Sequence, residues 1–141
     1  MSEEQAQQLL QQMQMLESYF IDLSNREETL FNVLREATSA IESIKSLKEN
    51  ENSESLVPIG MGTYVQSKIS SKDKIVLNIG AGIAMEKDTD AAINYLEARI
   101  KEIEIAIQDT SAKKHDASAR LEHGKEQMNQ LMMAAQKQSS G

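Results

Sequence analysis

The stretch LVPIGMGTYVQSKISSKDKIVLNIGAGIAMEKD, residues 56–88, decides the fold of this chain. It holds four short runs suited to β-strands, at residues 56–59, 63–69, 74–79 and 83–86. Glycine-rich breaks at 60–62 and 80–82 and the polar turn at 70–73 separate these runs. Because the residues of a strand alternate between its two faces, Ile75, Leu77 and Ile79 share one face. The stretch predicts two β-hairpins or a small meander.

The sequence before this stretch predicts one long helix over residues 2–49. It contains neither glycine nor proline, and its apolar side chains recur at alternating spacings of three and four. An average spacing of 3.5 residues is typical of a coiled-coil seam. Glu27 is the one polar side chain in that register. The apolar seam positions are Ala6, Leu9, Met13, Leu16, Phe20, Leu23, Leu30, Leu34, Ala37, Ile41 and Ile44.

A second long helix is predicted over residues 88–138. Asp88 and Thr89 are both suitable caps for its first turn, and Asp90 suits the positive end of the helix dipole. The seam weakens in the middle, where Thr110 and Lys114 replace apolar residues. In order, the seam positions are Ile93, Leu96, Ile100, Ile103, Ile107, Thr110, Lys114, Ala117, Leu121, Gly124, Met128, Leu131 and Ala135.

The two seams are expected to pair with each other. If residues 50–87 turn the chain back so that Ile44 faces Ile93, Glu27 lies opposite Thr110 and within one turn of Lys113 and Lys114. The polar interruptions of the two seams then coincide, as expected of an antiparallel register. We therefore predict a mainly α fold: a long antiparallel two-helix coiled coil with two β-hairpins at the helix-to-helix connection, all within a single subunit of residues 1–141.

The predicted strands have too few partners within one chain. Four short strands leave open edges and an apolar face, and such small sheets are marginal alone. Another subunit is the simplest way to pair those edges and to bury that face, so we expect residues 50–87 to drive oligomerisation. The expected interface side chains are apolar: Val65, Ile69, Ile75, Leu77, Ile79 and Ile83.

Two uncharged segments, residues 5–16 and 127–136, form what we call the neutral windows. In the predicted hairpin they lie side by side, at the end remote from the strands. Such windows are either ordinary seam ends or a flexible apolar binding surface, and physical arguments alone leave both interpretations open. Leu10, Met15, Met132 and Met133 lie off the seam and are expected to be partly exposed. The candidate binding residues are Leu9, Leu10, Met13, Met15, Met128, Leu131, Met132 and Met133.

The composition argues against several functions. With 22 acidic and 15 basic residues the net charge is −7, which disfavours binding to nucleic acids. The chain has no cysteine, no apolar run long enough to cross a membrane and no P-loop motif. His115 and His123 are eight residues apart on a helix, too far apart to share a metal. We therefore expect a cytoplasmic protein that is not an enzyme and that has no metal, cofactor or membrane partner.

The order of helix, two hairpins and helix resembles the α class of prefoldin subunits, of the archaeal type. The resemblance spans nearly the whole chain and is most specific in residues 56–88, at Val57-Pro58-Ile59-Gly60 and at the turn Asn78-Ile79-Gly80-Ala81-Gly82. It implies a hetero-hexamer of two α and four β subunits whose hairpins form a β-barrel base. It also implies an ATP-independent holdase that captures non-native proteins at its distal tips and passes them to a group II chaperonin. From the residues alone, a structural or tethering coiled coil without client binding stays an alternative.

Overall fold

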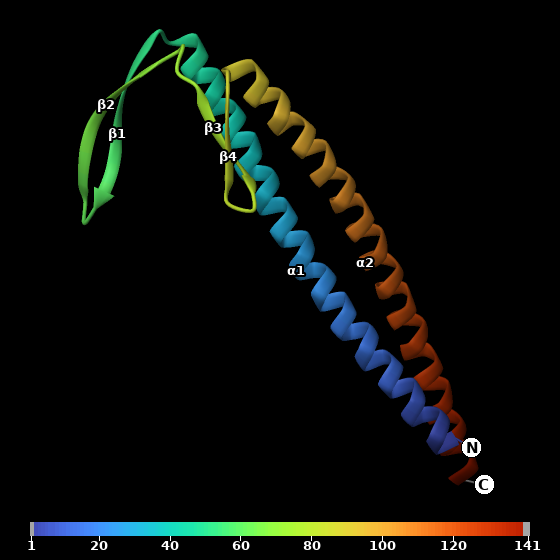
Figure 1. The fold of residues 1–141 in the computed structure, drawn as a ribbon. Coiled ribbons are helices and arrows are strands. Elements are labelled where there is room, and N and C mark those ends of the chain that lie inside the picture. Colours follow the sequence, from blue (N-terminus) through green and yellow to red (C-terminus); the bar gives the residue numbers. More distant parts are fainter. Residues whose placement is uncertain (1, 140–141) are drawn as a thin grey trace. The chain divides into compact units, whose positions relative to one another are not determined.

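The computed structural model describes residues 2–139, and the side chains of residues 3–138. The described residues form two helices and four strands in the order α1 (Ser2–Glu49), β1 (Asn52–Gly60), β2 (Thr63–Ser70), β3 (Ile75–Gly80), β4 (Ile83–Lys87) and α2 (Thr89–Ser139) (Figure 1). Strands β1 and β2 make one antiparallel sheet, and β3 and β4 make another. The predicted class is confirmed, with two separate hairpins instead of a meander.

The contacts divide the chain into two compact units, which we describe separately. The terminal unit comprises the residues up to Phe31 and those from Ile105 onward. The hairpin unit comprises Asn32–Glu104 and therefore contains all four strands. Each long helix contributes residues to both units.

The hairpin unit has a small apolar core built from three elements. Ile41 and Ile44 of α1 pack with Ala92 and Ile93 of α2, and Leu77 of β3 completes the cluster. Four further apolar side chains pack against this core: Ile75, Tyr95, Leu96 and Ile100. Ile44 and Ile93 thus lie in the same buried cluster, as the predicted antiparallel register requires.

This core corrects one expectation about the strands. Leu77 is only 9% exposed, because the helices of its own chain cover it. Ile75 packs against the same cluster and is partly buried. Leu77 therefore needs no neighbouring subunit for its burial, and its own chain already covers part of Ile75. Alternation along β3 correctly placed them on one face, and that face is turned toward α1 and α2.

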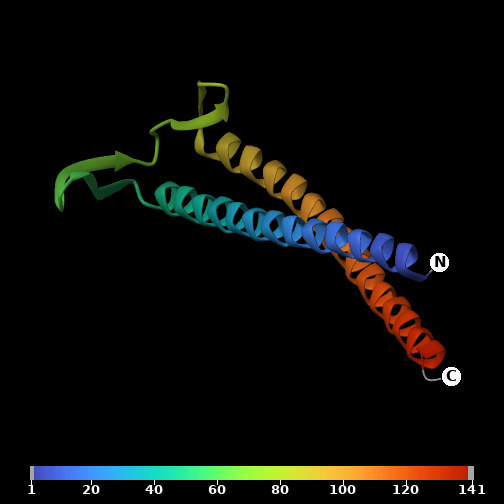
Figure 2. The same cartoon turned by 90° about the horizontal axis from the view of Figure 1, so that it is seen from below.

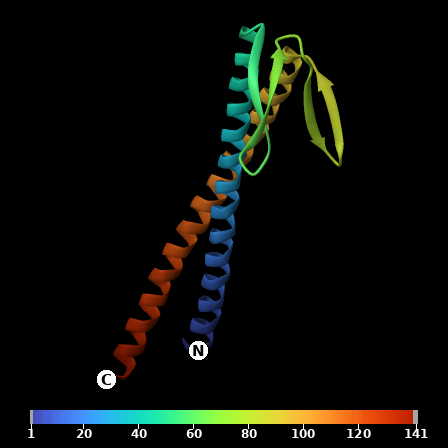
Figure 3. The ribbon, with the colours of Figure 1, turned by 90° about the vertical axis from the view of Figure 1, so that its left-hand side faces the viewer.

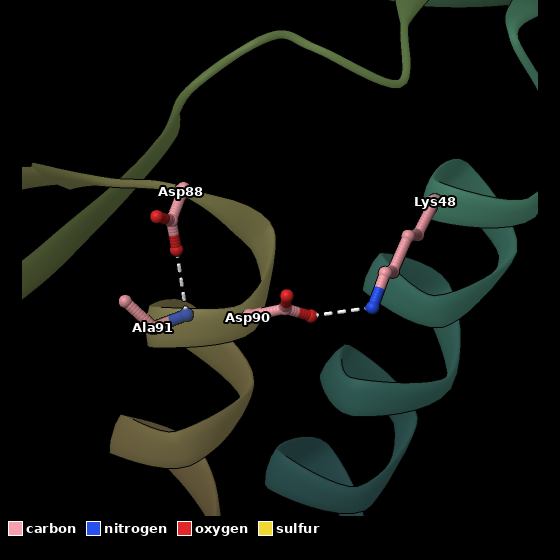
Figure 4. Close-up of polar contacts among 4 residues, drawn as sticks. All are labelled: Lys48, Asp88, Asp90 and Ala91. Atoms are coloured by element: carbon pink, nitrogen blue, oxygen red, sulfur yellow. Dashed lines mark hydrogen bonds and ion pairs between the residues drawn. The ribbon is translucent and has the colours of Figure 1, made fainter.

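The second helix begins with a side-chain cap. The backbone N–H of Ala91 donates to Oδ1 of Asp88 at 2.8 Å, so Asp88, and not Thr89, is the N-cap (Figure 4). One residue into the helix, Oδ1 of Asp90 lies 2.5 Å from Nζ of Lys48 on α1. Both side chains are largely exposed, so this ion pair contributes little free energy.

Candidate functional site

The terminal unit is held together by the predicted seam. Leu23, Ala117 and Gly124 are buried, and the other seam positions of this unit are at least partly buried from Ala6 to Leu30 on α1 and from Ile107 to Leu131 on α2. Ala135 is exposed, so the prediction that it belongs to the seam is wrong. The first turns of α1 and the last turns of α2 lie apart in two views (Figures 2 and 3). The exposure of Ala135 agrees with this separation of the helix ends.

A polar layer crosses the seam of this unit at the predicted position. Nζ of Lys114 lies 3.2 Å from Oε1 of Glu27 and 5.4 Å from the centre of the Phe20 ring. Lys113 instead pairs with Asp109 on its own helix, at 3.0 Å. The hydroxyl of Thr110, which is almost fully buried, donates to the backbone carbonyl of Ala106 at 2.7 Å. The coincidence of the two polar interruptions is thus confirmed, and Lys114 is the partner of Glu27.

The Glu27–Lys114 pair is expected to specify register more than it stabilises the fold. Replacing Glu27→Leu alone leaves a partly buried ammonium without its carboxylate and should lower the free energy of unfolding by about 1–2 kcal/mol. The double variant Glu27→Leu/Lys114→Leu fills the seam with apolar groups and should match or exceed the original stability. Urea denaturation followed by circular dichroism measures both changes.

The exposed pair Arg99–Glu102, 2.8 Å apart, supplies the matched control. Glu102→Leu should change the unfolding free energy by no more than about 0.5 kcal/mol. A Glu27→Leu variant as stable as Glu102→Leu would contradict the assigned role of the seam pair.

An apolar groove lies between α1 and α2 within the terminal unit. Its volume is about 730 Å³. Five of its lining residues lie within the first neutral window, and two of these five are methionines. The lining comprises Leu9, Gln12, Met13, Met15, Leu16 and Tyr19 of α1 and Ala119, Arg120, His123, Gly124 and Gln127 of α2. Arg120 is also paired with Asp116, one turn away on the same helix, at 3.1 Å. The groove is therefore mainly an apolar surface with a polar rim.

A second depression, of about 450 Å³, continues this surface and is lined mostly by glutamine. Its lining comprises Gln5, Gln8, Leu9, Gln12, Gln127, Gln130 and Leu131. All seven residues belong to the neutral windows. Residues 5–12 of the first window and 127–131 of the second therefore line one depression, as the antiparallel register predicts. Amide side chains can donate and accept hydrogen bonds without the solvation cost of a charge, which suits contact with a polypeptide backbone.

The structure gathers only part of the predicted binding set in the groove. Leu9, Met13 and Met15 line it, and Met15 is 74% exposed. Met128 and Leu131 are partly buried in the seam. The three other predicted residues lie outside the groove and are exposed, as expected for off-seam positions: Leu10, Met132 and Met133.

Sequence reasoning missed Tyr19 and Gly124 as groove residues. Tyr19 is 45% exposed and lies next to the seam residue Phe20, and nothing in the helical periodicity gives it a role. The periodicity places Gly124 on the seam and gives no sign that it lines a groove. His123, expected to be solvated, is exposed but also lines the groove.

The hairpin unit carries a separate apolar surface. Val65, Ile79 and Ile83 of the predicted interface set are exposed, whereas Ile69 is partly buried. Further exposed apolar side chains, not in the predicted set, lie on the strands and their turns: Leu56, Val57, Ile59, Met61, Tyr64, Val76 and Met85. In hairpin β1–β2, Val57 pairs with Val65 and Pro58 pairs with Tyr64, so apolar side chains occur on both faces. Among the described residues, no layer covers either face of this hairpin.

The residues that the structure describes lack three kinds of feature. No group of three or more histidine, cysteine, aspartate or glutamate side chains is placed to hold a metal ion there. Among the same residues, no buried side-chain nitrogen or oxygen lacks a hydrogen-bond partner. None of the described helices is long and apolar enough to cross a bilayer.

Comparison with known proteins gives consistent matches. The family model "Prefoldin subunit" matches residues 2–139. The chain is 71% identical over 136 residues to "Prefoldin subunit alpha" of Nitrosopumilus maritimus strain SCM1, covering 96% of this chain and 94% of that protein. It is 31% identical over 133 residues to the protein of the same name in Methanospirillum hungatei JF-1, covering 94% and 87% of the two chains. Among solved structures, filamentous PFD from Methanocaldococcus jannaschii superposes with a TM-score of 0.66 at 22% identity, over 83% of this chain and 95% of the other.

Proposed function

This chain belongs to the prefoldin family, and we propose that it is the α subunit of a hetero-hexameric chaperone that holds non-native polypeptides without ATP. In this proposal two copies assemble with four β-class subunits, and the complex passes its clients to a group II chaperonin. The clients bind along the neutral windows and the groove beside them. The single observation that carries the client-binding step is the apolar groove lined by Leu9, Met13 and Tyr19.

The chemistry of the groove suits a binding site that must accept many sequences. Methionine is unbranched and polarizable, so its side chain adapts to different apolar partners. The absence of charge across residues 5–16 and 127–136 removes the desolvation cost that a charged surface would impose on each client. Non-native proteins expose the apolar side chains that native proteins bury, so such a surface binds them in preference to folded proteins.

Weak binding at each groove is part of the proposed mechanism. Burying one methylene contributes about 0.8 kcal/mol, so one groove that covers a few client side chains gains only a few kcal/mol. Several grooves in one complex raise the effective concentration of binding sites and provide avidity. Because each contact is weak, a client can be released stepwise to a second chaperone without nucleotide hydrolysis by this complex.

The exposed faces of the hairpins support the proposed assembly. Val57, Val65 and Ile83 are apolar and uncovered within this chain. Burial by other subunits removes this surface from water and pairs the open strand edges. The proposed interface thus keeps Val65, Ile69, Ile79 and Ile83 from the predicted set, while Leu77 and Ile75 support the interface from within the subunit.

A reconstitution experiment tests the whole proposal. The chain is mixed with a β-class prefoldin subunit, the mass of the product is measured by light scattering, and a chemically denatured protein is diluted into it without nucleotide. We expect a complex with two copies of this chain and four of the partner, suppression of client aggregation, and refolding once a group II chaperonin and ATP are added. A complex that assembles and leaves aggregation unchanged would instead favour a structural or tethering coiled coil.

A further inference from the structure

Gly124 is a glycine without a backbone reason to be one. It lies in the interior of α2, and positive φ angles occur in the described residues only at the hairpin turns, so its conformation is accessible to any residue. Glycine is among the poorest helix formers because it has the most backbone freedom to lose. Gly124 is also buried. Some other requirement must therefore account for the missing side chain.

That requirement is visible in the packing against α1. A Cβ atom at position 124 would lie 3.0 Å from Cγ of Met13, 3.3 Å from its Sδ and 3.7 Å from its Cε. The Met13 side chain thus occupies the space that a side chain at 124 would fill. Met13 and Gly124 both line the apolar groove. How deeply Met13 lies against α2 therefore determines how much of the groove stays open.

We propose that Gly124 is a positioning residue for client binding: it lets Met13 lie against the backbone of α2 and so keeps the groove open for an apolar client side chain. This inference rests on the proposed function, because it assigns the groove to clients. A methyl group at 124 pushes Met13 away from α2. The groove is the open space next to Met13, so the flexible thioether moves into it and occupies volume that the client needs.

The variant Gly124→Ala separates this role from a merely structural one. Alanine is the best helix former, so the midpoint of thermal unfolding should rise by about 2–4 °C. Client holding should fall at the same time: about fourfold more assembled complex should be needed for equal protection, as for losing about one buried methylene per contact. A structural role alone predicts that holding stays equal or improves as the helix becomes more stable.

Two matched variants complete the test, all in the complex assembled with a β-class subunit. Gly124→Ala/Met13→Ala removes the displaced side chain and should restore holding to at least half the original level. Ser118→Ala, at an exposed position of α2 outside the groove, raises helix propensity and should leave holding unchanged. Peroxide oxidation of Met13, followed by mass spectrometry, should be severalfold faster in Gly124→Ala, while oxidation of the exposed Met15 stays constant.

Each of these measurements tests whether Gly124 positions Met13 for client binding. Unchanged holding in Gly124→Ala, a lowered unfolding midpoint, unchanged oxidation of Met13, or failure of Met13→Ala to restore holding would overturn the assignment of Gly124. If the unmodified complex holds no client at all, the proposed function fails. The oxidation of Met13 still shows in that case whether Gly124 positions it.

Discussion

Deletion of residues 1–12 together with 129–141 should leave assembly intact and remove most of the capacity to hold non-native proteins. The deletion takes away Leu9 and Gln12 of the groove, most of the first neutral window and most of the second. It spares the hairpin unit, whose core of Ile41, Leu77 and Ile93 is built from residues well inside the remaining chain. Client binding and subunit assembly, the two functions proposed for this chain, therefore depend on different parts of its sequence.

The deletion should reduce client protection strongly, because avidity multiplies the loss of binding at each groove. If each groove loses about 1–2 kcal/mol of client contact, binding to a single subunit weakens by about 5–30-fold. A client that touches two or three subunits at once then loses the product of these factors. We expect protection in a light-scattering aggregation assay to fall to less than about a tenth of that given by the intact complex.

Point variants provide a matched control for the deletion. Replacing the four exposed off-seam residues Leu10, Met15, Met132 and Met133 by serine should reproduce much of the loss without shortening the chain. Replacing Ile21 and Ile105 by serine removes exposed apolar side chains of the same unit outside the windows, and it should leave protection unchanged. If the deleted complex protects clients as well as the intact one, the neutral windows are not the binding surface.

The helices and their register could be predicted because they depend on periodicity. A seam of apolar residues every 3.5 positions specifies which helix faces meet. The register follows because the polar residue Glu27 in the first seam lies opposite the polar interruption at Thr110 and Lys114 in the second. The observed distance of 3.2 Å between Nζ of Lys114 and Oε1 of Glu27 confirms that register. The hairpins were predictable for a similar reason, since the glycines of each turn have positive φ values, such as 98° at Gly80 and 73° at Gly82.

Periodicity could not predict which elements cover the strands, nor could it predict the groove between the helices. Alternation shows that Leu77 belongs to an apolar face, but it does not say whether α1 and α2 or another subunit covers that face. The groove depends on where two helices approach and separate, which a one-dimensional pattern does not contain. Tyr19 and Gly124 became functional candidates only through that geometry, since one lies off the seam and the other has no side chain.

Association with β-class subunits should depend on the exposed face of hairpin β1–β2 that carries Val57 and Val65. Val57 and Val65 pair directly across β1 and β2, so their side chains lie on the same face, and both are about half exposed. Replacing both by lysine places two like charges opposite each other on a surface that assembly would bury. An unpaired buried charge costs several kcal/mol, so we expect the association with β-class subunits to weaken by at least about 1,000-fold.

The single chain with both valines replaced by lysine should still fold, so a loss of the complex can be attributed to the changed surface. Neither valine belongs to the core around Leu77, so circular dichroism should still report long helices while light scattering reports free subunits instead of the complex. Ile105→Lys, a lysine at an exposed apolar position of α2 outside the hairpins, controls for added charge and should assemble normally. The conservative variant Val57→Ile/Val65→Ile keeps the face apolar and should also assemble. A complex of unchanged mass formed by the double lysine variant would show that this face of β1–β2 stays in water, and the subunit contacts would then have to lie elsewhere.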